Sequence, residues 1–272
     1  MTTTFSLLAL LVASAAAVRS TWSPCGLSML STITPLAERA KGHRYAVTCT
    51  WFVVGAVVGG LALGTAVAVS AAVVDAVAWT PATGAAVGLA ASLIALASDT
   101  GLVGVRVPVH YRQVNERWLD AYRPWVYGAG FGFQIGSGVA TYITTAAVYL
   151  VVVLGALTGD PLVALAVGGA FGLVRGLAVT LTRRVTTPTG LLAFHREFGA
   201  LLPWAERAVL ATTGLSVIVL ATALPGAAPA AVAVVIVAAV AARGVVRAGR
   251  RATTSSNDGP PAADHGPSVP VV

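Results

Sequence analysis

The stretch STWSPCGLSMLSTITP, residues 20–35, interrupts an apolar run that extends over residues 5–36. Arg19 comes directly before it, and the stretch contains a Ser-Pro pair, a cysteine, several hydroxyl side chains and a second proline. An apolar run of this length is typical of a membrane span. Polar groups in lipid are costly unless they face protein or water. The stretch therefore predicts a broken helix whose polar side faces the protein interior.

The composition of the whole chain supports a membrane protein. Its 272 residues are 57% hydrophobic and only 10% charged, and the mean hydropathy is +0.83. Soluble domains carry about 25% charged residues, so this chain cannot cover a water-facing surface. We expect an all-α integral membrane protein. Arginine supplies nearly all of the basic residues, which we take as an indication of a high-GC bacterial genome and of a bacterial inner membrane.

Seven apolar segments are long enough to count as candidate spans: 5–36, 45–74, 82–98, 126–157, 162–182, 208–224 and 228–243. They predict one polytopic transmembrane domain over residues 1–247. The Pro- and Ser-rich tail, 248–272, has little to bury and should be disordered. A cleaved signal peptide at the N-terminus is the alternative to a retained first span. We favour the retained span because no basic residue precedes the apolar run.

The basic residues alternate between the connections. Apart from Arg19 and Arg175, all of them fall in 37–44, 99–125, 183–207 or the C-terminal end, whereas 75–81, 158–161 and 225–227 contain none. Basic loops face the cytoplasm, so we predict an N-terminus outside the cell and a cytoplasmic C-terminus. This distribution accounts for the formal net charge of +7 without nucleic acid as a partner.

Two spans are interrupted in a similar way, and each is followed by a glycine-rich span. The first break lies at Ser23–Gly26 and the second at GAGFGFQIGSG, residues 128–138. The next spans contain FVVGAVVGGLALG, residues 52–64, and VGGAFGLVRGLAV, residues 167–179. Because the two halves run in opposite directions, we predict an inverted 3+3 repeat, about 5–98 against 126–224, with one added span.

Polar side chains follow both breaks at helical spacing, which places them on one helix face. Together with the two arginines inside the apolar segments, they form the predicted substrate-binding set: Arg19, Ser23, Cys25, Ser28, Thr32, Gln134, Ser137, Thr141 and Arg175. Charged residues inside a membrane are rare and mostly functional. No acidic residue lies deep in any predicted span, so we expect an exogenous anion or backbone carbonyls to pair with the arginines. The alternatives are hydroxyls that hold helices together and an Arg175 that reaches the membrane surface.

The segments SPCGLSMLSTITP, GHRY and FVVGAVVGGLALG resemble the first hairpin of the cytochrome c biogenesis and thiol–disulfide interchange membrane proteins, the CcdA and DsbD type. That family lies within the broader LysE-like group of transporters. The resemblance implies a pair of membrane cysteines that carries electrons to thioredoxin-like partners. The sequence departs from the family in its second half, where Gly136, Ser137 and Gly138 stand about where the matching cysteine would be. Cys49 should lie roughly 12 Å from Cys25 in depth, too far for a disulfide.

Ser23 can cap a half-helix that begins at Pro24, which places Cys25 in its first turn. A helix N-terminus favours a thiolate or a bound anion. Three hypotheses follow: a transporter for a small anionic solute, a thiol-dependent electron carrier with Cys25 as its catalytic residue, or a non-transporting membrane assembly factor. We favour transport. The sequence contains no Walker loop, HExxH or GxSxG motif, and its histidines lack metal-site spacing. We therefore expect no enzyme activity, no metal and no cofactor, with membrane lipid as a further partner.

Two cytoplasmic connections are amphipathic. In LLAFHREFGALL the residues Leu191, Phe194, Phe198 and Leu201 share one helix face, and VNERWLDAYRPW, residues 114–125, shows the same spacing. We expect both to form short helices that lie at the membrane surface.

Overall fold

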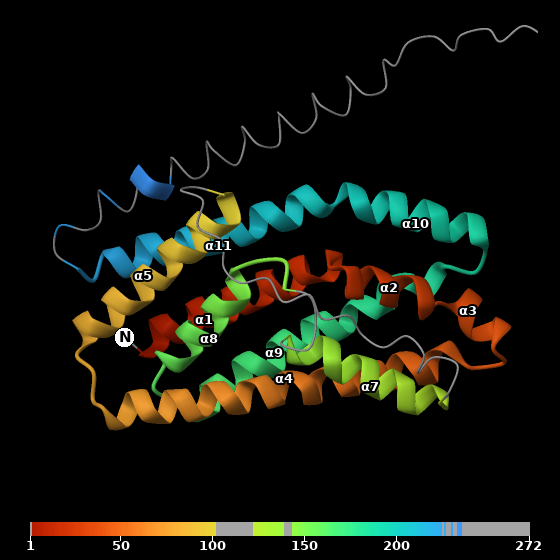
Figure 1. Cartoon of the computed structure of the whole chain (residues 1–272), viewed down its shortest axis with the longest axis horizontal. Helices are drawn as coiled ribbons and strands as arrows, with labels where there is room; N and C mark the ends of the chain where they lie inside the picture. Colours follow the sequence, from red (N-terminus) through yellow and green to blue (C-terminus); the bar gives the residue numbers. More distant parts are fainter. Residues whose placement is uncertain are drawn as a thin grey trace, which may run out of the picture.

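The computed structural model describes residues 2–101, 122–138 and 143–224, together with 226, 230 and 233–235. All regular elements in these residues are helices, and most run along the long axis of an elongated bundle (Figure 1). In chain order the elements are α1 (Thr2–Arg19), η1 (Ser20–Trp22), α2 (Pro24–Thr32), α3 (Pro35–Ala40), α4 (Tyr45–Ala76), α5 (Pro81–Thr100), α7 (Pro124–Ser137), α8 (Ala147–Ala156), α9 (Pro161–Leu177), η3 (Ala178–Arg184), α10 (Pro188–Ala200) and α11 (Leu202–Ala221). The predicted all-helical fold is confirmed at this level.

Prolines mark where many of the helices begin. Five helices have proline at the first helical position and a capping side chain immediately before it: Ser23, Thr34, Thr80, Asp160 and Thr187. Each of these side chains accepts a hydrogen bond from a backbone amide of the first turn, which otherwise has no partner within the helix. Proline costs nothing there because its missing N–H is one that the helix cannot use.

Within the described residues, five helical segments are long and apolar enough to cross a membrane: Thr2–Ser20, Tyr45–Ala76, Pro81–Thr100, Pro161–Arg184 and Pro188–Ala221. The chain is therefore a multi-pass membrane protein by the character of its helices. The predicted count of seven spans is not confirmed. The predicted fourth span is divided into the shorter α7 and α8, and most of the predicted seventh, 228–243, lies outside the described residues, as does the tail, 248–272.

Both predicted helix breaks are present, and the second lies at the end of the predicted stretch. The chain leaves the α-helical conformation at Ser20–Ser23, between α1 and α2. In the second half, α7 stays helical through the glycine-rich stretch and ends only at Gly138, whose φ of 68° is the left-handed conformation that glycine adopts at helix ends. The break thus lies at the C-terminal end of the predicted stretch, residues 128–138, and the part of that stretch before Gly138 is helical.

Those glycines serve close packing between helices. Gly128, Gly132 and Gly136 are four residues apart, so they share one face of α7. A Cβ atom built on Gly132 would lie 2.0 Å from the carbonyl oxygen of Phe52 in α4. Small residues at this spacing let two membrane helices approach backbone to backbone. The glycine-rich face of α7 is therefore a surface that packs closely against α4.

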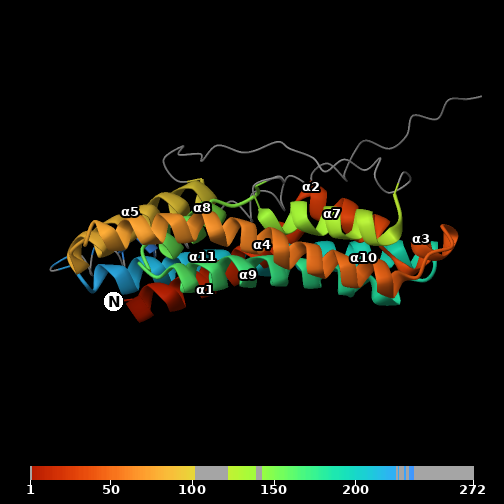
Figure 2. The same ribbon diagram turned by 90° about the horizontal axis from the view of Figure 1, so that it is seen from below.

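The two glycine-rich spans predicted to be equivalent pack directly against each other. Gly60 and Gly64 of α4 face Gly168 and Gly172 of α9, and a Cβ atom built on Gly168 would lie 2.4 Å from the Gly60 carbonyl oxygen. The helix α4 thus uses one row of glycines against α7 and another against α9. Figure 2 shows α4 between these neighbours.

The other spans surround this centre. The helix α1 contacts α8, α9 and α11, and α5 packs on α11. A large apolar cluster joins them, with Phe5, Val67, Leu154 and Phe171 among its buried members. In the predicted inverted repeat, α4 would be equivalent to α9 and α5 to α11. The members of each of these pairs contact each other. The repeat itself and its boundaries stay a prediction.

The amphipathic segment after residue 187 differs from expectation. It forms α10, which continues along the molecule into α11 with only Leu201 between them (Figure 1). Phe198 is buried and its ring stacks on Trp22 at 4.2 Å. Part of the apolar face that we expected at the membrane surface therefore packs against the protein. Most of the other predicted surface helix, residues 114–125, lies outside the described residues.

Candidate functional site at the two helix breaks

Arg175 connects the two breaks. It lies in α9 and is 3% exposed. Its Nη1 donates to the carbonyl oxygen of Ile135 at 2.7 Å, near the end of α7, and its Nη2 donates to the carbonyl oxygen of Ser20 at 3.4 Å, at the end of α1. The last carbonyls of a helix lack partners within the helix and carry partial negative charge. One guanidinium therefore stabilises both helix ends and holds them together.

These contacts decide between the partners that we considered for Arg175. Backbone carbonyls, one of the two predicted alternatives, are bonded to its guanidinium. The guanidinium carbon also lies 5.7 Å from the centre of the Phe171 ring, within the range of a cation–π contact. A reach to the membrane surface is excluded, since the residue is buried.

Arg19 has an acidic partner, which the sequence analysis missed. Its Nη2 lies 3.2 Å from Oε1 of Glu206 in α11. Nearby, Asp99 at the end of α5 accepts hydrogen bonds from the Thr145 hydroxyl at 2.6 Å and the Ala146 amide at 2.7 Å. The expectation that an exogenous anion or backbone carbonyls would pair with the arginines was therefore wrong for Arg19. Glu206 had been assigned to a polar connection, and only the packing of α11 on α1 brings it to the break.

The half-helix after the first break has the predicted form. Ser23 caps α2 and accepts from the Gly26 amide at 3.2 Å. Cys25 is 4% exposed, belongs to an apolar cluster with Met29, and lies within electrostatic range of Arg175. Burial in apolar surroundings is typical of an unreactive, structural cysteine.

Two of the remaining predicted hydroxyl side chains bond carbonyl groups of their own helices. Thr32 donates back to the Ser28 carbonyl within α2 at 2.9 Å, and Ser137 donates to the Gln134 carbonyl within α7 at 2.9 Å. Such bonds to the preceding turn satisfy a hydroxyl without a ligand. Thr141 lies outside the described residues. The polar stripes thus include hydroxyls that bond their own helices, and the set as a binding site stays a prediction.

A buried polar cluster at the other end of α2–α3 was not predicted. Glu38 is fully buried, and its carboxylate accepts from the Tyr127 hydroxyl at 2.6 and 2.7 Å and from the Thr48 hydroxyl. His43 approaches the same carboxylate at 4.0 Å. Glu38 stands among basic residues in the sequence, so it resembled a solvated loop residue. The cluster ties α3 to α4 and α7.

Neither cysteine forms a disulfide. Cys49 lies at the edge of the apolar cluster that contains Cys25 and is half-buried. Within the described part of the chain, no group of three or more His, Cys, Asp or Glu side chains is placed to hold a metal ion.

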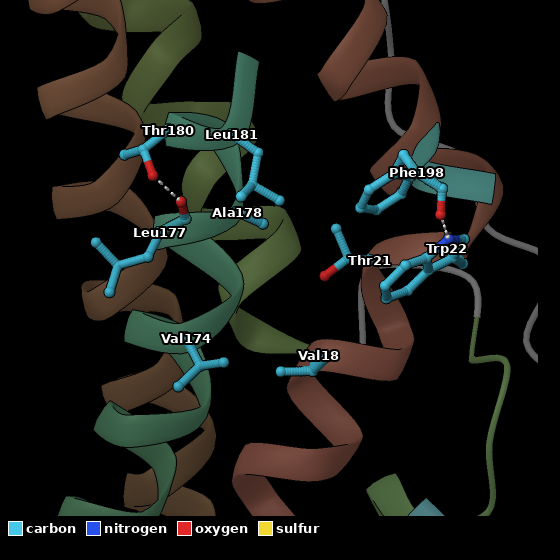
Figure 3. A pocket seen from close by; sticks show the side chains of 9 residues that line it. All are labelled: Val18, Thr21, Trp22, Val174, Leu177, Ala178, Thr180, Leu181 and Phe198. Carbon is cyan, nitrogen blue, oxygen red and sulfur yellow. Dashed lines mark hydrogen bonds between the residues drawn. The ribbon is translucent and has the colours of Figure 1, made fainter. Parts of the chain in front are cut away.

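A groove of about 300 Å³ opens beside the first break, between η1, η3 and α10 (Figure 3). We call it the Trp22 groove, after the residue whose ring lines it on one side. Most of its walls are aliphatic or aromatic, and they include Val18, Thr21, Trp22, Val174, Leu181 and Phe198. Arg175 is engaged elsewhere, so this hollow does not have the lining that a small anion requires.

Comparison with known proteins identifies relatives with a common description. The chain is 30% identical over 218 residues to the methylamine utilization protein MauF of Paracoccus denitrificans, a match that covers 74% of this chain and 73% of that protein. It is 27% identical over 217 residues to MauF of Paracoccus versutus, with 78% of each covered. For MauF of Methylorubrum extorquens the identity is 27% over 188 residues, with 67% and 66% covered.

No family model matches the chain. No solved structure matches it either. These relatives are not named as cytochrome c biogenesis proteins, so the resemblance to the CcdA and DsbD type stays a hypothesis about mechanism. The extent of the similarity to the Paracoccus denitrificans protein is sufficient to assign a family. The chain belongs to the MauF family of methylamine utilization proteins.

Proposed function

We propose that this protein is a non-transporting membrane assembly factor that serves methylamine utilization. One observation carries the proposal: both arginines at the helix breaks are bonded to the protein itself, Arg175 to two backbone carbonyls and Arg19 to Glu206. A transport site for an anion needs cationic groups directed at the solute. Here these groups hold the helices together, as expected of a scaffold that presents a surface to other proteins.

The tight helix packing supports the same proposal. Alternating access requires one group of helices to move against the other around a site. In this chain α4 contacts both α7 and α9 through glycine rows at backbone distance. Packed seams of this kind have little freedom to slide. A rigid membrane scaffold is compatible with such packing.

Growth of a deletion strain tests whether the protein takes part in methylamine utilization. Deletion of the gene in its host should abolish growth with methylamine as sole nitrogen source and leave growth with ammonium unchanged. An affinity-tagged copy that restores growth should co-purify from solubilised membranes with another protein that the cell produces on methylamine. Normal growth of the deletion strain on methylamine would contradict the assignment to this process.

Two finer mechanisms compete with the assembly role, and matched variants separate them. In a thiol–disulfide carrier of the CcdA and DsbD type, Cys25→Ser should abolish growth on methylamine, and a mixed disulfide with a thioredoxin-like protein should be trapped through Cys25. In a transporter for a small anionic solute, Arg175→Gln and Arg19→Gln should abolish growth while the amount of protein stays normal.

The assembly role predicts a different result for the same three variants. Cys25→Ser should grow within about twofold of wild type once growth is normalised to the amount of protein, because the assembly role needs no thiolate at this position. Arg175→Gln should lower the amount of protein in the membrane, since two helix ends lose their donor. Growth per molecule, with the amount measured by immunoblot, should change little.

A further inference from the structure

The polar groups that line the Trp22 groove are already satisfied. Figure 3 shows the Trp22 ring nitrogen donating to the Phe198 carbonyl oxygen at 3.0 Å and the Thr180 hydroxyl donating to the Leu177 carbonyl oxygen at 2.7 Å. The Thr21 hydroxyl donates to the Ala17 carbonyl oxygen at 3.3 Å. A polar solute would lose its hydration shell in the groove and gain few hydrogen bonds. A hydrocarbon chain would lose nothing and fill the space.

One wall of the groove consists of residues from the end of α9 and the first turn of η3. From Val174 to Leu181 the wall extends over about 12 Å, at 1.5 Å per residue in the α-helix and 2.0 Å per residue in the 3₁₀-helix. Val18 and Leu181 are 42% and 53% exposed. The groove therefore opens toward the surroundings of the helices, which in a membrane are lipid chains.

Two arginines follow the wall of the groove. A 3₁₀-helix has three residues per turn, so side chains three apart stand one above the other. Arg184 therefore continues the row of Ala178 and Leu181, and Arg183 continues the row of Leu177 and Thr180. Both arginines are exposed, and each lies about 6 Å along the axis from the last groove residue of its row. The groove is apolar along its length and basic at one end.

We propose that the Trp22 groove binds one acyl chain of an anionic phospholipid, whose phosphate contacts Arg183 and Arg184. Arginine matches phosphate geometry better than lysine because its planar group donates two parallel hydrogen bonds. These arginines end the candidate span Pro161–Arg184, at the level where headgroups lie. The site would attach a lipid between α1, α10 and η3, next to the break that Arg175 closes. The inference does not depend on the proposed assembly role.

Trp22 provides a direct probe of the groove. In a variant that keeps Trp22 and carries phenylalanine at the other tryptophans, fluorescence is measured in phosphatidylcholine vesicles as a brominated lipid is added. Each arginine should favour an anionic lipid by about fivefold. Brominated phosphatidylglycerol should therefore quench Trp22 at a much lower mole fraction than brominated phosphatidylcholine does. The paired change Arg183→Gln and Arg184→Gln should remove this difference.

Two controls localise the effect. Arg39→Gln with Arg44→Gln alters two exposed arginines that do not line the groove and should keep the preference for phosphatidylglycerol. Val18→Phe adds bulk at the open side of the groove and should reduce quenching by both lipids. Equal quenching by the two lipids in the parent variant would mean ordinary surrounding lipid and would overturn the proposal. Absence of quenching by either would also overturn it, since another protein or a closed wall would then cover Trp22.

A second measurement uses the unaltered chain. In detergent, added phosphatidylglycerol should raise the melting temperature more than phosphatidylcholine does, because a ligand that binds only the folded state stabilises it. The difference should disappear in the Arg183→Gln and Arg184→Gln variant and persist in the Arg39→Gln and Arg44→Gln variant. The same shift with both lipids, or its persistence without Arg183 and Arg184, would show that no anionic-lipid site exists here.

Discussion

Two neighbouring glycines in α9 should respond in opposite ways to the same substitution. A Cβ atom built on Gly168 lies 2.4 Å from the Gly60 carbonyl oxygen and 2.5 Å from the Gly64 backbone nitrogen. A Cβ atom built on Gly169 meets only the end of the Leu61 side chain, at 3.3 Å. The backbone of α4 can move away from a new methyl group only if the whole helix shifts, whereas the Leu61 side chain can rotate away. The pair therefore separates the cost of close helix packing from the general effect of alanine in this helix.

The expected magnitude follows from these distances. Ordinary contact of a Cβ atom begins at 3.4 Å, so Gly168→Ala must separate α4 from α9 by about 1 Å. A gap of that size forfeits a quarter to a half of the dispersion energy of the atoms beside it. Overpacking of this kind costs about 1–3 kcal/mol, which should lower the melting temperature by roughly 2–12 °C in a chain of this size. Gly169→Ala should be neutral or stabilising by up to about 1 kcal/mol, because alanine favours helix over glycine.

The assay is thermal unfolding of the two purified variants and wild type in the same detergent, followed by loss of the monodisperse chromatographic peak. A Gly168→Ala variant that melts within about 1 °C of wild type would refute the backbone contact between α4 and α9. Equal losses of stability in Gly168→Ala and Gly169→Ala would also refute it. The loss would then come from a general effect of alanine in α9 and not from the contact with α4.

Three further predictions test other parts of the structure. Ser23→Ala removes the side-chain cap of α2 and should lower the free energy of unfolding by about 1 kcal/mol; an unchanged melting temperature would mean that the cap does not form. Tyr127→Phe leaves Thr48 as the hydroxyl donor to the Glu38 carboxylate and should cost about 1–3 kcal/mol; a fully stable variant would show that the Tyr127 hydroxyl does not stabilise the buried carboxylate. In a cysteine-free background, Val77→Cys should react with a membrane-impermeant maleimide in intact cells and Arg39→Cys should not; the reverse result would invert the predicted orientation.

Much of the fold could be predicted because the signals are local. Apolar length, capping residues and proline positions act within a few residues, so the starts of α2, α5, α9 and α10 could be inferred from Ser-Pro, Thr-Pro and Asp-Pro pairs. The break at Ser23 follows from the same rule. These interactions form in any tertiary context, and the sequence alone therefore predicts them.

The predictions that failed depended on distant partners. Glycine can end a helix or allow another helix to approach, and the stretch from Gly128 to Gly136 does the second because α4 lies against it. Glu206 and Glu38 looked like solvated loop residues, since nothing near them in sequence shows that Arg19 and Tyr127 lie beside them in space. The sequence shows where the charged residues are, but it does not show which residues they contact in the folded protein.

The sequence by itself determined that this protein is helical, lies in a membrane and has a broken first span, because hydrophobic length and helix capping are properties of short segments. Only the tertiary structure decided what the polar groups at the breaks do. Arg175 stands 40 residues from Ile135 and 155 residues from Ser20, and no periodicity links them. Its role follows from the approach of α4, α7 and α9 along their glycine rows, which brings two helix ends to one guanidinium.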